Sequence, residues 1–363
     1  MATEATERTI ERAASGEPTT TGWRRSRFSA WVYLAVVAAA LLPVLTHFTG
    51  WISNYSYLQL SLVLVFSIAV LGLNLLTGFN GQISLGHGAF FGIGAYTAGI
   101  LLDQTGVPYW ATIPVAALVC FSIGYLFGFP ALRLEGHYLA LATLALAIAM
   151  PQILKYRHLE GLTGGVQGLN LIKPDAPFGL PLSPDQWMYL VVLAVAVVMF
   201  WLARNLLDSR MGRAMMAIRD YSMAAQTMGI NNARVKMTTF GISALYTGVA
   251  GALHAIIFEF IAPDSFRLEL SISLLVGAVV GGIASLPGAL LGGAFVQLIE
   301  KYADAATRFV SHNVNLPIEL EPWTLYGIML IVLMFVMPTG IAGGLAALAR
   351  RFGLGAKGGA DGR

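Results

Sequence analysis

The chain has 363 residues, of which 56% are hydrophobic and 11% charged, and its formal net charge is +3 at pH 7. Soluble domains carry about 25% charged residues, because a water-exposed surface needs ionised groups. The composition therefore excludes soluble globular and disordered classes, and the single cysteine, Cys120, excludes a disulfide framework and a thiolate metal cluster. The basic residues form no patch interleaved with aromatic residues, so nucleic-acid binding has no support. We predict an all-α polytopic membrane protein.

Apolar windows predict the membrane-spanning helices, since about 20 mostly apolar residues are needed to cross a bilayer. We expect about ten transmembrane helices (roughly eight to eleven). They lie near residues 30–46, 57–77, 84–102, 110–129, 137–154, 187–203, 237–258, 269–284, 288–303 and 323–340. The windows 269–284 and 288–303 are short, and they predict either two short helices or a broken re-entrant pair.

The two ends of the chain are hydrophilic and predict disordered tails at 1–27 and 350–363, on either side of a transmembrane domain at 28–349. Most Lys and Arg residues fall in the tails and in alternate connections between the expected helices. Because basic residues favour the cytoplasmic side, this pattern predicts that both termini are cytoplasmic. It also places a loop at 204–236 in the cytoplasm and a loop at 155–186 outside.

The first polar stretch inside the membrane domain lies between Asn74 and Tyr96. Its glycines allow helices to approach closely, or allow the backbone to unwind where it lines a cavity. Two interpretations stay open: a tightly packed helix pair whose polar groups bond between helices, or a segment that lines a translocation pathway. The pathway candidates are Asn80, Gln82, Ser84, Gly86, His87 and Gly88.

A weak internal repeat is offset by 200 residues, since Gly81 and Gly92 recur as Gly281 and Gly292. A parallel duplication would produce this pattern. Glycine-rich segments also match by chance, so both explanations stay open.

Two connections carry further polar landmarks. Arg133 and Glu135 precede the fifth expected helix, where they either pair and fix the start of the helix or act in gating. The outer loop 155–186 contains Thr163-Gly164-Gly165 and is long for a connection. It either binds a partner or forms a solvated spacer.

The cytoplasmic loop 204–236 mixes charged residues with methionines and is helical in composition up to Met228. Gly229 is well placed to end that helix. Soft apolar side chains among charges suit a helix that binds in a partner's groove. An amphipathic helix that lies on the membrane surface has the same composition, so both interpretations stay open.

The expected spans contain almost no ionisable residue. This argues against a proton-driven carrier, which needs a relay carboxylate or histidine, and against an intramembrane hydrolase, which needs a catalytic cluster. Backbone carbonyls could still bind sodium. No lysine is followed by Ser or Thr, so the chain has no P-loop, and another subunit must supply ATP hydrolysis if ATP drives transport.

The stretch from Asp208 to Lys236 resembles the coupling loop of ABC importer permeases, and specifically of the high-affinity branched-chain amino acid permeases of the LivM type. The matching residues are Ser209-Arg210-Met211-Gly212-Arg213-Ala214, Ala217-Ile218-Arg219-Asp220, Ala224-Ala225, Gly229-Ile230-Asn231 and Lys236. Other landmarks of the family match Asn74–Tyr96, Leu132–Ala140 and Thr163-Gly164-Gly165. Together the matches cover most of the chain from about 58 to 340.

The resemblance implies the permease subunit of an ATP-binding-cassette importer, a transport subunit without catalytic residues, metal or cofactor of its own. The implied partners in a bacterial inner membrane are a second related permease, two ATP-binding subunits that hold ATP and Mg, and an external substrate-binding protein. The residues expected to couple to the ATPase are Arg210, Gly212, Arg213, Arg219, Asp220, Ala224, Ala225 and Gly229. The family has a carboxylate near its Ala-Ala pair, whereas Met223 stands there in this chain, which leaves open which charge pairs form with the ATPase.

The resemblance implies a branched-chain or related hydrophobic amino acid as substrate. Related permeases for urea share the same landmarks, so urea, short amides or aromatic acids are alternatives within this class. A self-sufficient channel or a sodium-coupled carrier is the alternative from a different class. A membrane enzyme has the least support, because the sequence shows no catalytic cluster.

Overall fold

The computed structural model describes most of the expected membrane domain, namely residues 53–132, 137–177 and 182–298 together with Ala39, Leu41, Gly327, Ile331 and 340–344. The chain divides into two units, Met1–Leu45 and Thr46–Arg363, and every contact below belongs to the second. Several predictions lie outside the described residues: the tails 1–27 and 350–363, the pair Arg133 and Glu135, and nearly all of the windows 30–46 and 323–340.

Four described helices are long and apolar enough to cross a membrane, and they coincide with four expected windows. They are α3 (Asn54–Asn80), α5 (Tyr109–Ala131), α8 (Pro184–Asp208) and α10 (Asn232–Phe258). A fifth candidate consists of α6 (His137–Leu154) and a continuation bent by 61°, which comprises η2 (Arg157–Leu159) and α7 (Glu160–Thr163). This part of the chain agrees with an all-α membrane protein, while the total of about ten helices stays a prediction.

Several shorter helices also occur among the described residues. They are α4 (His87–Ile100), which continues into the π-helix η1 (Leu101–Thr105), the 3-10 turn η4 (Pro263–Phe266), α11 (Leu268–Gly281) and a helix at Leu286–Leu298. The expected window 84–102 is wrong at its start, because the non-helical segment 81–86 precedes α4. At about 1.5 Å per residue, the 14 residues of α11 extend about 21 Å, which is less than the ~30 Å core of a bilayer.

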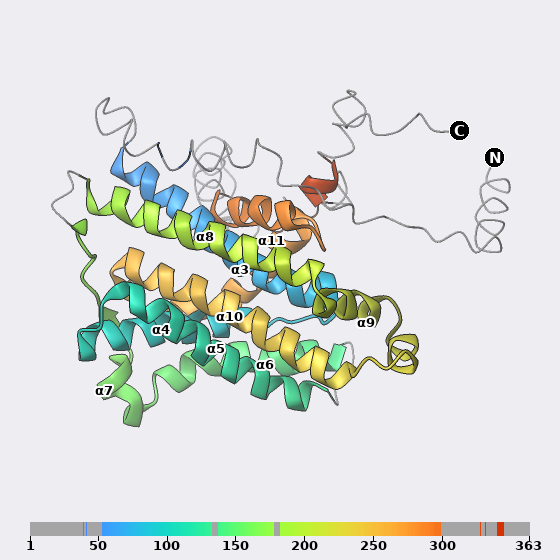
Figure 1. Ribbon diagram of the computed structural model, residues 1–363. Coiled ribbons are helices and arrows are strands. Elements are labelled where there is room, and N and C mark those ends of the chain that lie inside the picture. The colour runs from blue at the N-terminus through green and yellow to red at the C-terminus, as the bar shows by residue number, and fades with distance from the viewer. Residues whose placement is uncertain are drawn as a thin grey trace, which may run out of the picture. The chain divides into compact units, whose positions relative to one another are not determined.

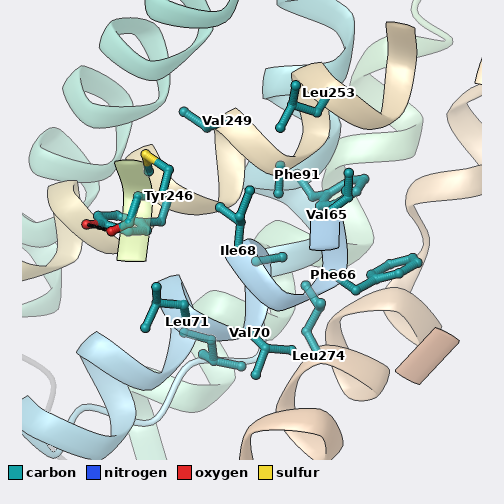
Figure 2. Packing of buried hydrophobic residues seen from close by; sticks show 14 of the residues in the cluster. Val65, Phe66, Ile68, Val70, Leu71, Phe91, Tyr246, Val249, Leu253 and Leu274 are labelled. Carbon is teal, nitrogen blue, oxygen red and sulfur yellow. Dashed lines mark hydrogen bonds between the residues drawn. The ribbon is translucent and has the colours of Figure 1, made fainter. Parts of the chain in front are cut away.

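Helix α10 lies at the centre of the bundle and packs against α3, α4 and α5, while α8 lies along α3 (Figure 1). Glycines allow the close crossings: a Cβ atom on Gly94 of α4 would overlap the backbone of Gly248 in α10. Apolar side chains fill the remaining space. Figure 2 shows Ile68 of α3 near Val249 and Leu253 of α10, all buried.

Segments that are far apart in the sequence, 155–185 and 260–264, contact each other at one end of the bundle, which we call the sheet end. Here the strands β1 (Leu169–Asn170) and β2 (Phe260–Ile261) pair antiparallel, a small departure from the all-α expectation. Lys155 Nζ lies 2.7 Å from Asp264 Oδ1, and Lys173 Nζ lies 2.8 Å from Asp185 Oδ1. The described part of the loop 155–186 is therefore joined to the segment 260–264, and its role as a partner site or a solvated spacer stays a prediction.

The helix α9 (Arg210–Thr227) lies at the opposite end of the bundle, which we call the α9 end (Figure 1). Two helix breaks also lie in the bundle, each between a helix that ends near a glycine and a short apolar helix. The first break, 81–86, separates α3 from α4, and the second, 282–285, separates α11 from Leu286–Leu298. Among the described residues, the windows 269–284 and 288–303 thus contain two short helices separated by a break, and a re-entrant arrangement of the pair stays a prediction. The two breaks lie at positions that the weak internal repeat relates.

Candidate functional site

The first break begins where α3 ends. Gly81 has a φ of +74°, a left-handed conformation that favours glycine, and it ends α3. The N–H of Gln82 donates to the carbonyl of Leu76 at 3.1 Å. These features turn the backbone sharply and direct the following residues into the bundle.

A chain of hydrogen bonds passes through His87. Its Nδ1 atom lies 2.9 Å from Ser84 Oγ and its Nε2 atom 2.6 Å from Ser243 Oγ. Ser243 Oγ in turn donates to the carbonyl of Gly72 at 2.6 Å. Since Ser243 uses its proton on Gly72, Nε2–H of His87 donates to Ser243, and Ser84 donates to Nδ1. A neutral imidazole satisfies every one of these bonds, and it ties the break to α3 and α10.

The break also contacts α6 and α11. The N–H of Leu85 donates to Thr143 Oγ1 at 2.9 Å, and the N–H of Gly88 donates to Ser271 Oγ at 2.9 Å. A Cβ atom on Gly86 would lie 2.6 Å from the carbonyl oxygen of Thr143, so glycine permits the contact with α6.

The six pathway candidates from the sequence therefore lie together, and we call them the polar cluster: Asn80, Gln82, Ser84, Gly86, His87 and Gly88. All six are buried within this chain. The Nδ2 of Asn80 donates to Gln82 Oε1 at 2.9 Å, and Asn80 Oδ1 is buried without a hydrogen-bond partner among the described residues. Within the break, Ile83 is the exposed large apolar side chain, at 43%. The cluster has the packing of a helix junction, and its role in a pathway stays a prediction.

The loop 204–236 is not one helix, because α8 ends at Asp208 and α9 begins at Arg210. Ser209 separates the two, since its Oγ accepts from the N–H of Met211 at 3.1 Å and caps the start of α9. A Cβ atom on Gly212 would lie 2.5 Å from Leu207 Cα, so glycine allows this close turn. The helix that the sequence predicts to end near Met228 therefore begins at Arg210, and it is kinked at Tyr221.

Gly229 ends α9, as the sequence predicts. Its φ is +84°, the N–H of Gly229 donates to Gln226 O at 3.0 Å, and the N–H of Ile230 donates to Ala225 O at 3.1 Å. This pair of bonds is a Schellman motif. The apolar residue Ile230 follows the glycine, which is the position where such a motif turns the chain back toward the helix.

The coupling candidates divide into two groups. Gly212 and Ala225 are buried against the bundle. The exposed candidates are Arg210, Arg213, Arg219, Asp220, Ala224 and Gly229. Beside them α9 exposes three large apolar side chains, with 67% of Tyr221, 66% of Met223 and 84% of Met228 accessible. Clustered exposed apolar side chains commonly mark an interaction surface.

Arg219 connects α9 to the first break. Its Nη1 donates to the carbonyl of Gly78 in α3 at 3.0 Å, and its Nε donates to Asp220 Oδ1 at 2.9 Å. A Cβ atom on Gly81 would lie 3.0 Å from Arg219 Cγ, so the stem of the arginine packs directly on the glycine that ends α3. The sequence predicts Arg219 as a docking residue, but its contact with α3 has no sequence signal.

The sequence analysis also missed the residues that hold the two breaks. Asn74 holds the second break: its Nδ2 donates to Ser285 O at 3.0 Å, and its Oδ1 accepts from the N–H of Ala284 at 2.8 Å. Ser243 and Ser271 bond to the first break, as described above. For Asn74 the available signal was a polar residue in a largely apolar stretch, where an unpaired polar group is costly.

Residues 57–337 match the protein family described as branched-chain amino acid transport system / permease component. The chain is 34% identical to the LivM permease protein of the high-affinity branched-chain amino acid transport system of Salmonella typhimurium, over 68% of this chain and 63% of the relative. It is 35% identical to the LivM permease protein of Escherichia coli, over 62% of this chain and 58% of the relative. The LivH permease protein of Salmonella typhimurium is 26% identical, over 77% of this chain and 91% of that protein.

No solved structure matches the chain. The match with the two LivM proteins spans about 63% and 58% of their lengths. The family match, in contrast, covers most of this chain, including both helix breaks and α9. The chain belongs to the family of permease components of branched-chain amino acid transport systems.

Proposed function

We propose that the chain is the membrane-spanning permease subunit of an ATP-binding-cassette importer, which translocates branched-chain or related hydrophobic amino acids. The observation that carries this proposal is α9, an ordered helix with an exposed apolar surface at the end of the bundle. A helix with Tyr221, Met223 and Met228 exposed suits the groove of a partner protein. The family membership supports the same role.

The proposed energy source is a pair of ATP-binding subunits that bind α9 and hold ATP and Mg. Support comes from the sequence, in which no lysine stands in a P-loop pattern. We further propose a second related permease and an external substrate-binding protein as partners. The similarity of this chain to both LivM and LivH of one organism supports pairing between two different but related permeases.

The proposed orientation places the α9 end in the cytoplasm and the sheet end outside, in a bacterial inner membrane. The α9 end carries a concentration of basic residues, which favour the cytoplasmic side: Arg204, Arg210, Arg213, Arg219, Arg234 and Lys236. The expected windows place six spans before the loop 204–236 and four after it. Because both numbers are even, both termini then lie on the same side as this loop, in the cytoplasm.

In the proposed mechanism, ATP-driven movement of α9 reaches the polar cluster through Arg219. Because Arg219 donates to Gly78 and packs on Gly81, a displacement of α9 acts on the end of α3 and on the first break. The pathway then opens where Asn80, Gln82 and the residues up to Gly88 leave their present partners. Binding of ATP to the partner subunits need only favour one of two arrangements of this break.

The test is reconstitution of the chain into liposomes, alone and with its partner subunits and a leucine-loaded binding protein. The proposal predicts leucine uptake only when the ATP-binding subunits and ATP are present. Leucine flux driven by a concentration or sodium gradient through the chain alone would contradict the importer mechanism. Uptake of urea but not leucine by the complete assembly would contradict the substrate.

A further inference from the structure

A cavity of about 720 Å³ lies at the sheet end, and we call it the outer cavity. Side chains of α3, α4, α10, β2, η4, α11 and the helix Leu286–Leu298 line it. Its volume falls in the range of about 300–1,000 Å³ that is typical of small-molecule sites. It lies at the end of the bundle opposite to α9, so it is distinct from the polar cluster.

The wall of the outer cavity is a connected set of aromatic rings. His254 stacks on Phe258 with 4.6 Å between ring centroids, and its ring lies edge-on to Phe91 at 5.2 Å. Phe91 also lies 6.1 Å from Phe266 and 6.0 Å from Phe66. Figure 2 shows Phe66 at the margin of the core, with its ring directed away from the other labelled side chains of α3. Such rings contact one another and form a rigid apolar surface.

The polar groups in the outer cavity are few and neutral. Gln297 Nε2 donates to Gln59 Oε1 at 3.0 Å. This bond uses one donor and one acceptor of the two amides, so one NH₂ group and one carbonyl oxygen keep further bonding capacity. His254 Nδ1 is buried and has no hydrogen-bond partner among the described residues. None of the described lining residues is Asp, Glu, Lys or Arg.

The aromatic wall and the neutral amides together indicate which chemical class of ligand the outer cavity would bind. A ligand with a net charge would lack a counter-ion in the cavity, and such burial is costly. A small polar ligand such as urea would leave the aromatic wall unfilled. A zwitterion with an apolar side chain satisfies both parts, because the amide pair can donate to its carboxylate and accept from its ammonium group, while the rings contact its side chain.

We infer that the outer cavity is a substrate site in which the aromatic wall holds the apolar side chain of a neutral amino acid, next to the Gln59–Gln297 pair. The inference rests on the proposed function and deepens it, because it names the region of the permease that first contacts the released substrate. It also favours an apolar amino acid over urea and short amides.

The outer cavity and the polar cluster are separate, but both include residues or contacts of α4 and α11. Leu270 lines the cavity, while the next residue of α11, Ser271, accepts from the N–H of Gly88 at 2.9 Å. On α4, Phe91 lines the cavity and Gly92 packs on the ring of Phe266. We therefore expect a change in the first break to reach the cavity wall through α4 and α11.

The first experiment fills the cavity. Leu58→Trp introduces an indole into the outer cavity, whereas the control Leu60→Trp makes the same change on α3 at a residue that is 38% exposed and does not line the cavity. In the reconstituted importer, Leu58→Trp should lower leucine uptake at least about tenfold. ATP hydrolysis stimulated by the loaded binding protein should stay within about twofold of the unmodified importer. Leu60→Trp should transport normally.

The second experiment locates the substrate directly, with a leucine analogue that carries a photoreactive diazirine in its side chain. During turnover the label should attach to peptides that contain Phe258, Phe260 or Phe266. Excess leucine and the Leu58→Trp change should each abolish it. Labelling confined to other segments would overturn the inference, and so would normal uptake by Leu58→Trp.

The outcomes separate this inference from the proposed function. If the unmodified importer takes up leucine and Leu58→Trp does so equally well, the outer cavity is not a substrate site, while the importer function stands. If the unmodified importer takes up no leucine, both the function and the assigned occupant fail.

Discussion

The two helix breaks have the same local design and different attachments. Each follows a helix that ends near a glycine, and each is held by polar side chains from other helices. The second break is held from inside the bundle by Asn74. The first break is held from inside by Thr143 and, through His87, by Ser243, and it is also joined to α9 through Arg219. We therefore expect a displacement of α9 to act first on the break 81–86, which lies next to the Arg219 contact, and less on the break 282–285.

The largest expected effect is the loss of the hydrogen bonds that hold the second break, in Asn74→Leu. The substitution removes the partners of the Ser285 carbonyl and the Ala284 N–H, and each buried unpaired group costs about 1–3 kcal/mol. We expect a loss of about 2–5 kcal/mol in the free energy of unfolding, seen as a lower melting temperature of the purified protein.

The matched control for that prediction is Ser61→Ala. Ser61 is also a buried polar residue of α3, but its Oγ donates to Tyr57 O within its own helix at 2.9 Å. Its removal should cost less than about 1 kcal/mol. Equal melting temperatures for the two variants would show that the second break needs no support from Asn74.

The next effect concerns coupling rather than stability. In the reconstituted importer, Arg219→Ala should lower leucine uptake at least about tenfold, while ATP hydrolysis continues, because α9 loses its bond to Gly78. Arg234→Ala, which changes an exposed arginine of α10, is the control and should leave both activities unchanged. Equal losses of uptake and hydrolysis in Arg219→Ala would argue for a docking role instead.

A smaller, local effect is expected for Gly229→Ala. A φ of +84° disfavours a residue with a Cβ atom by about 1 kcal/mol, so the last turn of α9 should open more often. Amide hydrogen exchange in the segment 224–230 should accelerate about fivefold. Gly106→Ala changes a glycine with a φ of +63° at the sheet end and should leave this segment unaffected. Unchanged exchange in Gly229→Ala would show that the glycine is not required.

The smallest effect is a pH dependence at the sheet end. Hydrogen bonds from Lys155 and from Arg267 hold the pKa of the Asp264 carboxyl below its ordinary value. A lowered pKa in the folded state gives stability that is present above about pH 4 and is lost as the pH falls below it. Asp264→Asn should flatten the dependence of the melting temperature on pH in this acid range. A steeper dependence in the variant would contradict the assignment.

The long helices could be predicted from the sequence because they depend on local composition. The windows 57–77, 110–129, 187–203 and 237–258 each contain enough apolar residues for a span, and helices occur at all four. Gly229 was equally predictable, because a glycine after a helical stretch commonly adopts a positive φ. These features need no knowledge of distant residues.

Other features depend on contacts far along the chain. In the described part of the loop 155–186, Lys155 bonds to Asp264, and the pairing of β1 with β2 joins residues about as far apart. The polar cluster was found as a group, but its partners Ser243 and Ser271 lie on α10 and α11. The outer cavity draws its wall from seven elements, so no local pattern could indicate it.

The central claim is that α9 and the first break move together. Spin labels at Met223, Ile83 and Trp110 test it directly, because all three side chains are exposed and Trp110 lies on α5 at the sheet end. Distances between labels in the assembled importer are measured with and without ATP. The account predicts that the distances from Met223 and from Ile83 to Trp110 both change, while the distance between Met223 and Ile83 stays constant. A change at Met223 with Ile83 fixed relative to Trp110 would contradict it.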